Sequence, residues 1–262
     1  MLRMEYLLEG AKELGLPLTK KRAILREYLQ VIILNSIYKG NFAKSMFFVG
    51  GTALRFFYNL PRFSEDLDFD TPSLERDGFK GILERVEMDL SREGFSPRIS
   101  HKERGNLFIA SVNFPGVMSE YEIIDGRGDN IMIKIEVNRP GWHLSTESHV
   151  LSMYGYNLSA ILMSKGALLS EKLSALLSKR RGRYIYDALF MLRKRFPFDR
   201  EVLYANNIRE EPKHLILNYL SGISKKELKQ LAEQVKPFLF KEDDIELILK
   251  APLYGKKFLS RY

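Results

Sequence analysis

The chain has no cysteine among its 262 residues, and no apolar run in it approaches the ~20 residues that a helix needs to cross a bilayer. The lack of cysteine excludes disulfides, thiolate metal sites and a cysteine nucleophile. The start, MLRMEYLLEGAKEL, lacks the uninterrupted apolar segment of a secretory signal. We therefore expect a cytoplasmic protein that makes no membrane contact. The histidines do not have the spacing of a zinc site; they are His101, His143, His149 and His214.

Acidic residues are in the minority, with 33 Asp and Glu against 41 Lys and Arg, so the net charge is +8. A positive excess favours polyanionic partners through counterion release, and nucleic acid before membranes. Many basic proteins bind no nucleic acid, so the charge alone does not decide the partner. The hydrophobic content of 45% is ordinary for a folded globular chain.

The apolar periodicity changes along the chain. In the first part, apolar residues recur with both strand and helix spacing, and in the last part with helix spacing alone. The boundary lies near residue 160. We predict strands over 46–49, 67–71, 97–104, 106–114, 130–140 and 157–163. We predict helices over 19–39, 52–60, 74–93, 168–181, 184–195 and 224–238. Thr19 is the expected N-cap of the first helix and Gly40 its stop, while Ser224 and Glu227 have capping-box spacing.

The segment VGGTALRFFYNLPRFSEDLDFD, residues 49–70, places several carboxylates on a predicted strand. Strand alternation puts Asp66, Asp68 and Asp70 on one face, with Leu67 and Phe69 on the other. Two carboxylates ~6.6 Å apart repel by ~2.5 kcal/mol at an effective dielectric constant near 20. An Mg²⁺ ion between them removes this repulsion. The alternative is an exposed acidic strand end, which is the commoner meaning of an isolated D-x-D.

Gly50 and Gly51 follow an apolar strand and precede a helix, so their amides can approach a phosphate at the helix N-terminus. Neither a Walker A loop nor G-x-G-x-x-G occurs. A glycine corner beside a D-x-D strand would place a triphosphate next to Mg²⁺. In 133–138 the polar residues Lys134, Glu136 and Asn138 share a face, and Glu136 completes the metal site if this strand pairs beside 66–70. An ordinary half-exposed strand explains the 133–138 pattern equally well.

The segment GGTALRFFYNLPRFSEDLDF resembles the opening motif of the AbiEii/AbiGii-like nucleotidyltransferase toxins of toxin–antitoxin systems, in the DNA polymerase β-like superfamily. Residues 171–192, EKLSALLSKRRGRYIYDALFML, are similar to the family's lysine-bearing helix and R-D-x-Y-D segment, with Lys172 and Asp187 at the matching positions. Tyr184 stands where the family usually has the first Asp. The resemblance implies an α+β fold, with a mixed β-sheet and flanking helices over 1–163 and an α-helical domain over 164–262.

The same resemblance implies the roles of individual residues. Gly50 and Gly51 would hold the phosphates of an NTP. Asp66 and Asp68 would bind Mg²⁺, and Glu136 stands where the superfamily has its third acid. Lys172 would contact the triphosphate, and Asp187 would orient Lys172 or assist deprotonation of the acceptor. The remaining candidates lie in the first motif and are Thr52, Arg62 and Ser64 for nucleotide binding, with Asp70 as an accessory acid.

Two of these first-motif candidates also have other interpretations. Arg62 either meets a phosphate or pairs with Glu65, and Ser64 is also a turn-capping residue.

The implied reaction is Mg²⁺-dependent transfer of NMP from an NTP to an acceptor, by a toxin with a cognate antitoxin protein. The acceptor is either RNA, such as the 3′ end of tRNA, or a protein. The basic run 179–183, followed by Tyr184 and Tyr186, favours RNA contact, although a solvated helix end explains it too. A non-catalytic RNA- or nucleotide-binding module of the same fold, and a housekeeping nucleotidyltransferase without an antitoxin, are the other hypotheses.

Overall fold

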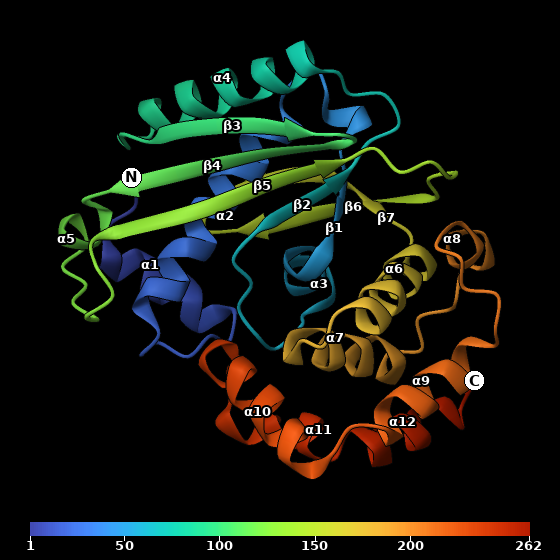
Figure 1. Cartoon of the computed structure of the whole chain (residues 1–262). Helices are drawn as coiled ribbons and strands as arrows, with labels where there is room; N and C mark the ends of the chain where they lie inside the picture. The colour runs from blue at the N-terminus through green and yellow to red at the C-terminus, as the bar shows by residue number, and fades with distance from the viewer. The chain divides into compact units, whose positions relative to one another are not determined.

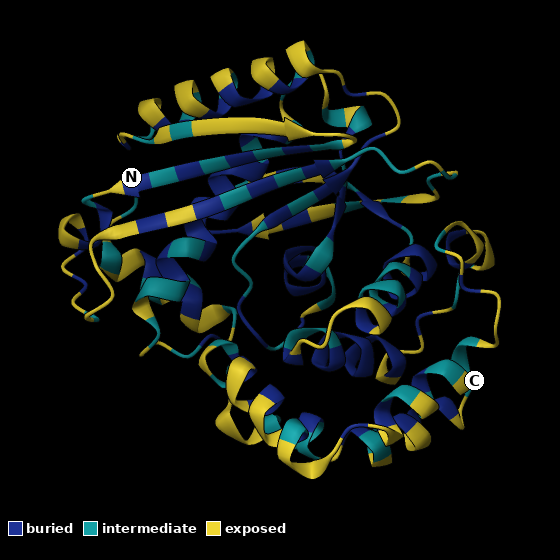
Figure 2. Cartoon of the chain, viewed as in Figure 1, coloured by how far each residue is buried: buried dark blue, intermediate teal, exposed yellow.

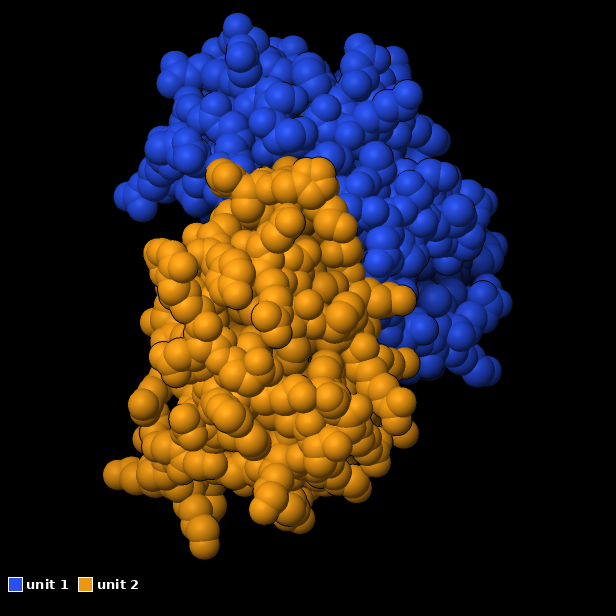
Figure 3. Space-filling view, turned by 90° about the vertical axis from the view of Figure 1, so that its right-hand side faces the viewer, with its two compact units in different colours: residues 1–59, 63–140, 146–162 blue, residues 60–62, 141–145, 163–262 orange.

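The computed structural model describes residues 1–262 and divides into two compact units (Figure 3). Unit 1 comprises residues 1–59, 63–140 and 146–162, and unit 2 comprises residues 60–62, 141–145 and 163–262. Two short segments, 60–62 and 141–145, therefore belong to the helical unit, although the division predicted at residue 163 assigns them to the first domain. Sequence patterns locate an element along the chain, but they do not show which unit a connecting segment packs with.

Unit 1 is built on a seven-stranded mixed sheet in the order β3-β4-β5-β2-β1-β7-β6 (Figure 1). The strands are β1 Phe47–Val49, β2 Leu67–Asp70, β3 Arg98–Arg104, β4 Leu107–Pro115, β5 Asn130–Asn138, β6 Thr146–Met153 and β7 Tyr156–Met163. Strand β2 lies between β1, to which it is antiparallel, and β5, to which it is parallel. The acidic strand is thus central in the sheet, and neighbours on both sides fix its backbone.

The helices of unit 1 pack on this sheet. They are α1 Met4–Glu13, α2 Lys21–Tyr38, α3 Gly50–Tyr58, α4 Arg76–Arg92 and α5 Val117–Glu120, with a short 3₁₀ turn η1 at Ala43–Ser45. Helix α4 buries a stripe that includes Phe79, Val86 and Leu90, and its outer side is exposed (Figure 2). The expected cap of α2 is wrong, because Lys20 takes the N-cap position and makes no side-chain cap. Gly40 follows the end of α2 as predicted.

Unit 2 is helical. Its elements are α6 Lys165–Ser178, α7 Gly182–Arg193, α8 Arg200–Ala205, α9 Pro212–Ser221, α10 Lys225–Val235, η2 Lys236–Phe238, η3 Glu242–Ile245, α11 Glu246–Leu249 and α12 Ala251–Leu259. Helix α7 is buried along most of its length (Figure 2). Its first residue, Gly182, lies so close to α10 that a Cβ would collide with the backbone of Leu231. At α10, the Ser224 hydroxyl accepts the N–H of Glu227 at 3.2 Å, which is one half of the predicted capping box. No helix is long and apolar enough to cross a membrane.

Candidate active site

The glycine corner lies directly against the acidic strand. Gly50 is the first residue of α3 and has φ +78°, a left-handed conformation that favours glycine. A Cβ on Gly50 would come within 3.0 Å of both Cβ and Cγ of Asp68. Val49, at the N-cap of α3, provides no side-chain cap. The first amides of α3 therefore lie next to Asp68, and no side chain from the N-cap accepts them.

The acidic face extends over two neighbouring strands. In the parallel pairing of β2 with β5, Asp68 is in register with Glu136, so the condition set for Glu136, that its strand pairs beside 66–70, is met. Leu67 is fully buried on the opposite face, as the alternation predicts. The side chains of Asp66 and Glu136 are each about one-third exposed, at 32% and 30%. These carboxylates are therefore accessible from solvent on the face that they share.

A lysine lies among these carboxylates. The Nζ atom of Lys134 is 3.2 Å from Oε1 of Glu136 and 3.9 Å from Oδ2 of Asp66. Partial burial by itself would lower the pKa of Lys134. The carboxylates of Asp66, Glu136 and Asp68 outweigh burial, so this pKa lies above its ordinary value and the ammonium keeps its charge. The acidic face thus has a cation of its own in the metal-free protein.

The three predicted metal ligands do not form a ready-made cage. No group of three or more His, Cys, Asp or Glu side chains in the structure has an arrangement that could hold a metal ion. Glu136 is in contact with the ammonium of Lys134, which also lies near Asp66. The donor set nevertheless suits a hard divalent ion, because partly exposed carboxylates from adjacent positions are the ligands that Mg²⁺ prefers.

The residues around the acidic face support its backbone. The Thr52 hydroxyl donates to the carbonyl of Asp66, and Thr52 is fully buried. The Thr52 side chain therefore has a structural partner, and its contact with a nucleotide stays a prediction. The Ser64 carbonyl accepts a hydrogen bond from Gln30 at 3.2 Å. Asp70, the accessory acid, is 3% exposed, and its Oδ1 accepts from Asn138.

In unit 2, two basic side chains converge on Asp187. Arg62 makes a bidentate contact, with Nε–Oδ1 2.8 Å and Nη2–Oδ2 2.7 Å. Lys172 Nζ donates to Oδ2 at 3.1 Å, so α6 and α7 bring Lys172 and Asp187 together. Burial alone would raise the pKa of Asp187, but Arg62 and Lys172 outweigh it and hold the pKa below its ordinary value. Asp187 is therefore an anion shared by two cations.

This cluster gives Arg62 a partner that neither predicted alternative includes. The carboxylate of Glu65 is 2.7 Å from Arg26. Arg62 is 2% exposed with its guanidinium bound to Asp187, and its contact with a nucleotide stays a prediction. Tyr184, which departs from the family pattern, places its ring 5.1 Å from the Nζ of Lys172. An aromatic ring next to an ammonium is a favourable contact, so Tyr184 helps to hold Lys172.

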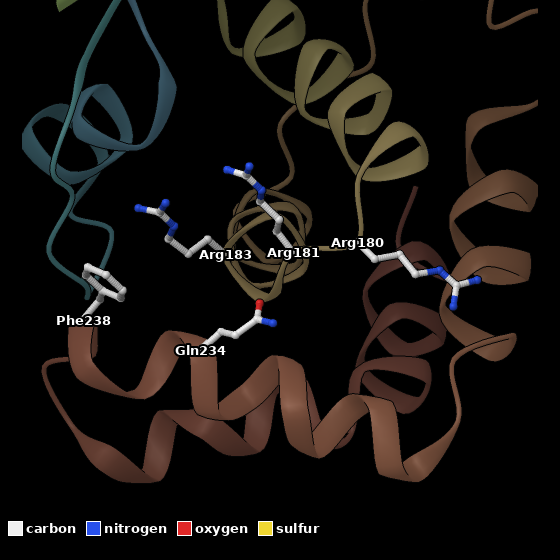
Figure 4. A pocket seen from close by; sticks show the side chains of 5 residues that line it. All are labelled: Arg180, Arg181, Arg183, Gln234 and Phe238. Carbon is white, nitrogen blue, oxygen red and sulfur yellow. The ribbon is translucent and has the colours of Figure 1, made fainter. Parts of the chain in front are cut away.

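The basic run before α7 lines an open pocket of about 390 Å³ with Arg180, Arg181, Arg183, Gln234 and Phe238 (Figure 4). Arg181 and Arg183 extend to the same side of α7, and Arg180 points away to the opposite side. Arg180 pairs with Glu227 at 2.6 Å, and Arg183 lies 5.2 Å from the ring of Phe238. The three guanidiniums therefore point in different directions and do not converge on one point.

The family description "Nucleotidyl transferase AbiEii toxin, Type IV TA system" matches residues 32–250. The chain belongs to this family. The protein is thus a nucleotidyltransferase of a toxin family, which implies an NTP as substrate and an antitoxin as partner. The match includes the glycine corner, the acidic face and the cluster around Asp187. No curated protein gives a match.

Solved structures share the fold of this chain at low sequence identity. The nucleotidyltransferase toxin MenT4 from Mycobacterium tuberculosis H37Rv has a TM-score of 0.58 and 16% identity, covering 98% of this chain and 90% of that one. A putative nucleotidyltransferase from H. pylori has a TM-score of 0.56 and 18% identity, with coverages of 92% and 96%. JHP933 from Helicobacter pylori has a TM-score of 0.53 and 19% identity, with coverages of 92% and 93%. The predicted mixed α/β architecture is confirmed.

Sequence reasoning gave no role to Lys134 and did not find the bond between Arg62 and Asp187. A signal for Lys134 was present, because the alternation of 133–138 places it two residues from Glu136 on the same face. No comparable signal exists for Arg62 and Asp187, which are 125 residues apart in the sequence.

Proposed function

We propose that the protein transfers NMP from an NTP to an acceptor at the acidic face, with Mg²⁺ held by Asp66 and Asp68 and with Glu136 as the third ligand. The observation that supports this most directly is the close approach of Gly50 to Asp68. It places helix amides, which bind phosphate, beside carboxylates, which bind a divalent ion. When bound, such an ion neutralises phosphate charge and activates the attacking oxygen.

The chain's own groups would position the nucleotide. The amides at Gly50 and Gly51 hold phosphate oxygens at the N-terminus of α3, and the Thr52 hydroxyl fixes the backbone of Asp66. Ser64 is half-exposed and stays a candidate for nucleotide contact. These groups orient the phosphates and form no covalent bond to them.

We assign Lys172 to the leaving phosphates and Asp187 to the orientation of Lys172. The support is the charge of the cluster, in which Arg62 and Lys172 share one carboxylate. Lys172 is the more exposed of the two cations, with 13% of its side chain accessible against 3% for Arg62. A compact ammonium that is partly accessible is suited to pyrophosphate, while the buried guanidinium keeps Asp187 in place.

We propose RNA, such as the 3′ end of tRNA, as the acceptor. The net charge of +8 and the pocket lined by Arg180, Arg181 and Arg183 support this choice over a protein acceptor. Substitution of Arg181 by Gln should weaken RNA binding and reduce the salt dependence of binding by about one ion. Arg98→Gln, an exposed arginine on β3, is the control. Transfer of label to protein with unchanged RNA binding would favour the protein acceptor.

The central experiment uses each α-labelled NTP with Mg²⁺ and total RNA or total protein from cells. Wild type should label one acceptor class, and Asp66→Asn with Asp68→Asn should abolish labelling while preserving the fold. The matched control is Asp77→Asn, whose carboxylate is 98% exposed on α4. Labelling that persists in the double variant, or a control that loses it equally, would contradict the assigned site. Growth arrest on expression, relieved in the double variant, tests whether transfer carries the toxicity.

A further inference from the structure

The acidic face holds its own cation, and this has a consequence for metal binding. We propose that Lys134 is an internal counter-cation that must leave Glu136 before a divalent ion binds there, so that Lys134 weakens metal binding by the free enzyme and makes it depend on nucleotide. This inference rests on the proposed function, because it takes Asp66, Asp68 and Glu136 as the metal ligands. It gives Lys134 a regulatory role at the site rather than a part in the chemistry.

The backbone gives the carboxylates no way to separate. Strand β5 is paired with β4 on one side and with β2 on the other, and Asp68 is in register with Glu136. Like charges on neighbouring strands destabilise a sheet. The Lys134 ammonium reduces this repulsion through its contacts with Glu136 at 3.2 Å and Asp66 at 3.9 Å. The ammonium therefore offsets part of the repulsion between the carboxylates that a bound divalent ion is expected to remove.

The ammonium and a divalent ion compete for the same oxygens. To bind a metal together with Asp66 and Asp68 through Oε1, Glu136 has to release its contact with Lys134. Lys134 can move away, because 33% of its side chain is exposed and its flexible stem leads to solvent. A triphosphate brings negative charge to the same face and offers the released ammonium new oxygen partners. Nucleotide should therefore favour the exchange of Lys134 for the metal.

The test measures Mn²⁺ binding without nucleotide, from the electron paramagnetic resonance signal of free Mn²⁺. Lys134→Met should bind Mn²⁺ at least about tenfold more tightly than wild type, because it removes a unit charge that competes with the ion. Lys134→Arg keeps the charge and should bind no more tightly than wild type. The control Lys229→Met removes an exposed lysine on α10 in unit 2, outside the sheet that carries these carboxylates, and should change nothing. A non-hydrolysable NTP should then improve Mn²⁺ affinity less in Lys134→Met than in wild type.

Thermal unfolding gives an independent readout. Without metal, Lys134→Met should melt below wild type, and saturating Mn²⁺ should raise its melting temperature more than that of wild type. Lys134→Gln serves the same purpose if the methionine variant does not fold. Mn²⁺ affinity that is equal or weaker in the Met and Gln variants would overturn the proposal.

Failure of the proposed function gives a different result. If Asp66→Asn with Asp68→Asn leaves Mn²⁺ binding intact, the metal site itself is wrongly placed. If that double variant loses Mn²⁺ and Lys134→Met binds as wild type does, only the role of Lys134 is wrong.

Discussion

Each unit contains one buried arginine–carboxylate pair, and the two pairs differ in charge balance. In unit 1, Arg55 contacts Glu27 through Nε and Nη2, both at 3.0 Å. In unit 2, Arg62 contacts Asp187 with the same bidentate geometry. Asp187 has a second cation in Lys172, whereas Arg55 is the only cation in contact with Glu27. Burial raises the pKa of Glu27 despite Arg55, while the two cations lower the pKa of Asp187.

The comparison shows that bidentate geometry does not distinguish a structural pair from a functional one. A one-to-one pair has no net charge and offers nothing to a charged ligand. A cluster of two cations and one carboxylate carries a positive surplus, and an anion is the natural third party. This charge balance agrees with the proposed role of Lys172 and Asp187 at the phosphates, and with a structural role for Glu27 and Arg55.

The largest effect is expected at Asp187. Asp187→Asn leaves two cations facing each other without a carboxylate, so we expect a loss of about 3–5 kcal/mol in the free energy of unfolding. Denaturant unfolding measures this loss. Glu27→Gln leaves only one cation without its partner and should cost less. If Glu27→Gln lowers the free energy of unfolding more than Asp187→Asn does, the surplus positive charge around Asp187 does not determine the cost of losing the carboxylate.

Lys172 should affect catalysis far more than stability. Lys172→Met removes the surplus charge and leaves Arg62 paired one-to-one with Asp187, so the fold should change little. Single-turnover transfer should fall by about 10²–10³-fold, the usual cost of losing one transition-state donor. Lys229→Met, an exposed lysine on α10, is the control and should keep full activity. Normal transfer in Lys172→Met would remove Lys172 from the phosphate site.

The pair in unit 1 should be replaceable. Glu27→Met with Arg55→Met exchanges a buried ion pair for apolar side chains, so stability should stay within about 2 kcal/mol of wild type. Transfer activity should stay within several-fold of wild type, measured with the same label. The corresponding exchange in unit 2, Arg62→Met with Asp187→Met, should abolish transfer even where the protein folds. An inactive but stable Glu27/Arg55 double variant would mean that this pair also serves the reaction.

The smallest effect at neutral pH comes from protonation of the two carboxylates. Protonation of Asp187 should destabilise the folded protein, and protonation of Glu27 should stabilise it. The lowered pKa of Asp187 means that its stabilisation is present above the ordinary Asp pKa of about 4 and is lost as the pH falls through the folded-state value. The raised pKa of Glu27 means that acidification favours its folded form. Melting temperatures of wild type and Asp187→Asn should stay apart from pH 7 to about 4 and begin to converge only as the pH falls below about 4. Those of wild type and Glu27→Gln should not converge for this reason, since protonation of Glu27 stabilises the wild type.

Local patterns predicted most of the sheet. The alternation in LDFD and in 130–138 identified β2 and β5, because one face of each strand is buried. Strand β6 was missed, since it is an edge strand and its first residues, TESHV, include no buried position to set a period. Helix α1 was also missed, and so were the short helices α8, α9, α11 and α12. Short helices have little room for a periodic pattern, and packing within unit 2 stabilises them.

Sequence reasoning from local patterns predicted one part of the candidate site and missed another. It found the glycine corner, the D-x-D pair and Glu136, because each follows from the alternation or from a motif. It considered Glu65 for Arg62 because the two are near in sequence, but Glu65 binds Arg26 and Arg62 binds Asp187. Partners so far apart are set by tertiary packing, which a single sequence does not encode in a readable pattern. Tyr184 shows the same limit, since its contact with Lys172 becomes visible only when α6 and α7 are folded.

The left-handed backbone at Gly50 has a consequence for genetics. Any side chain at Gly50 is strained by the backbone and collides with Asp68, so even alanine should disarm the protein. In a selection for cells that survive expression of the toxin, escape mutations at codon 50 should therefore be recovered alongside those that replace the aspartates. Such a selection would then recover Gly50, which has no functional group, together with the residues assigned to the chemistry.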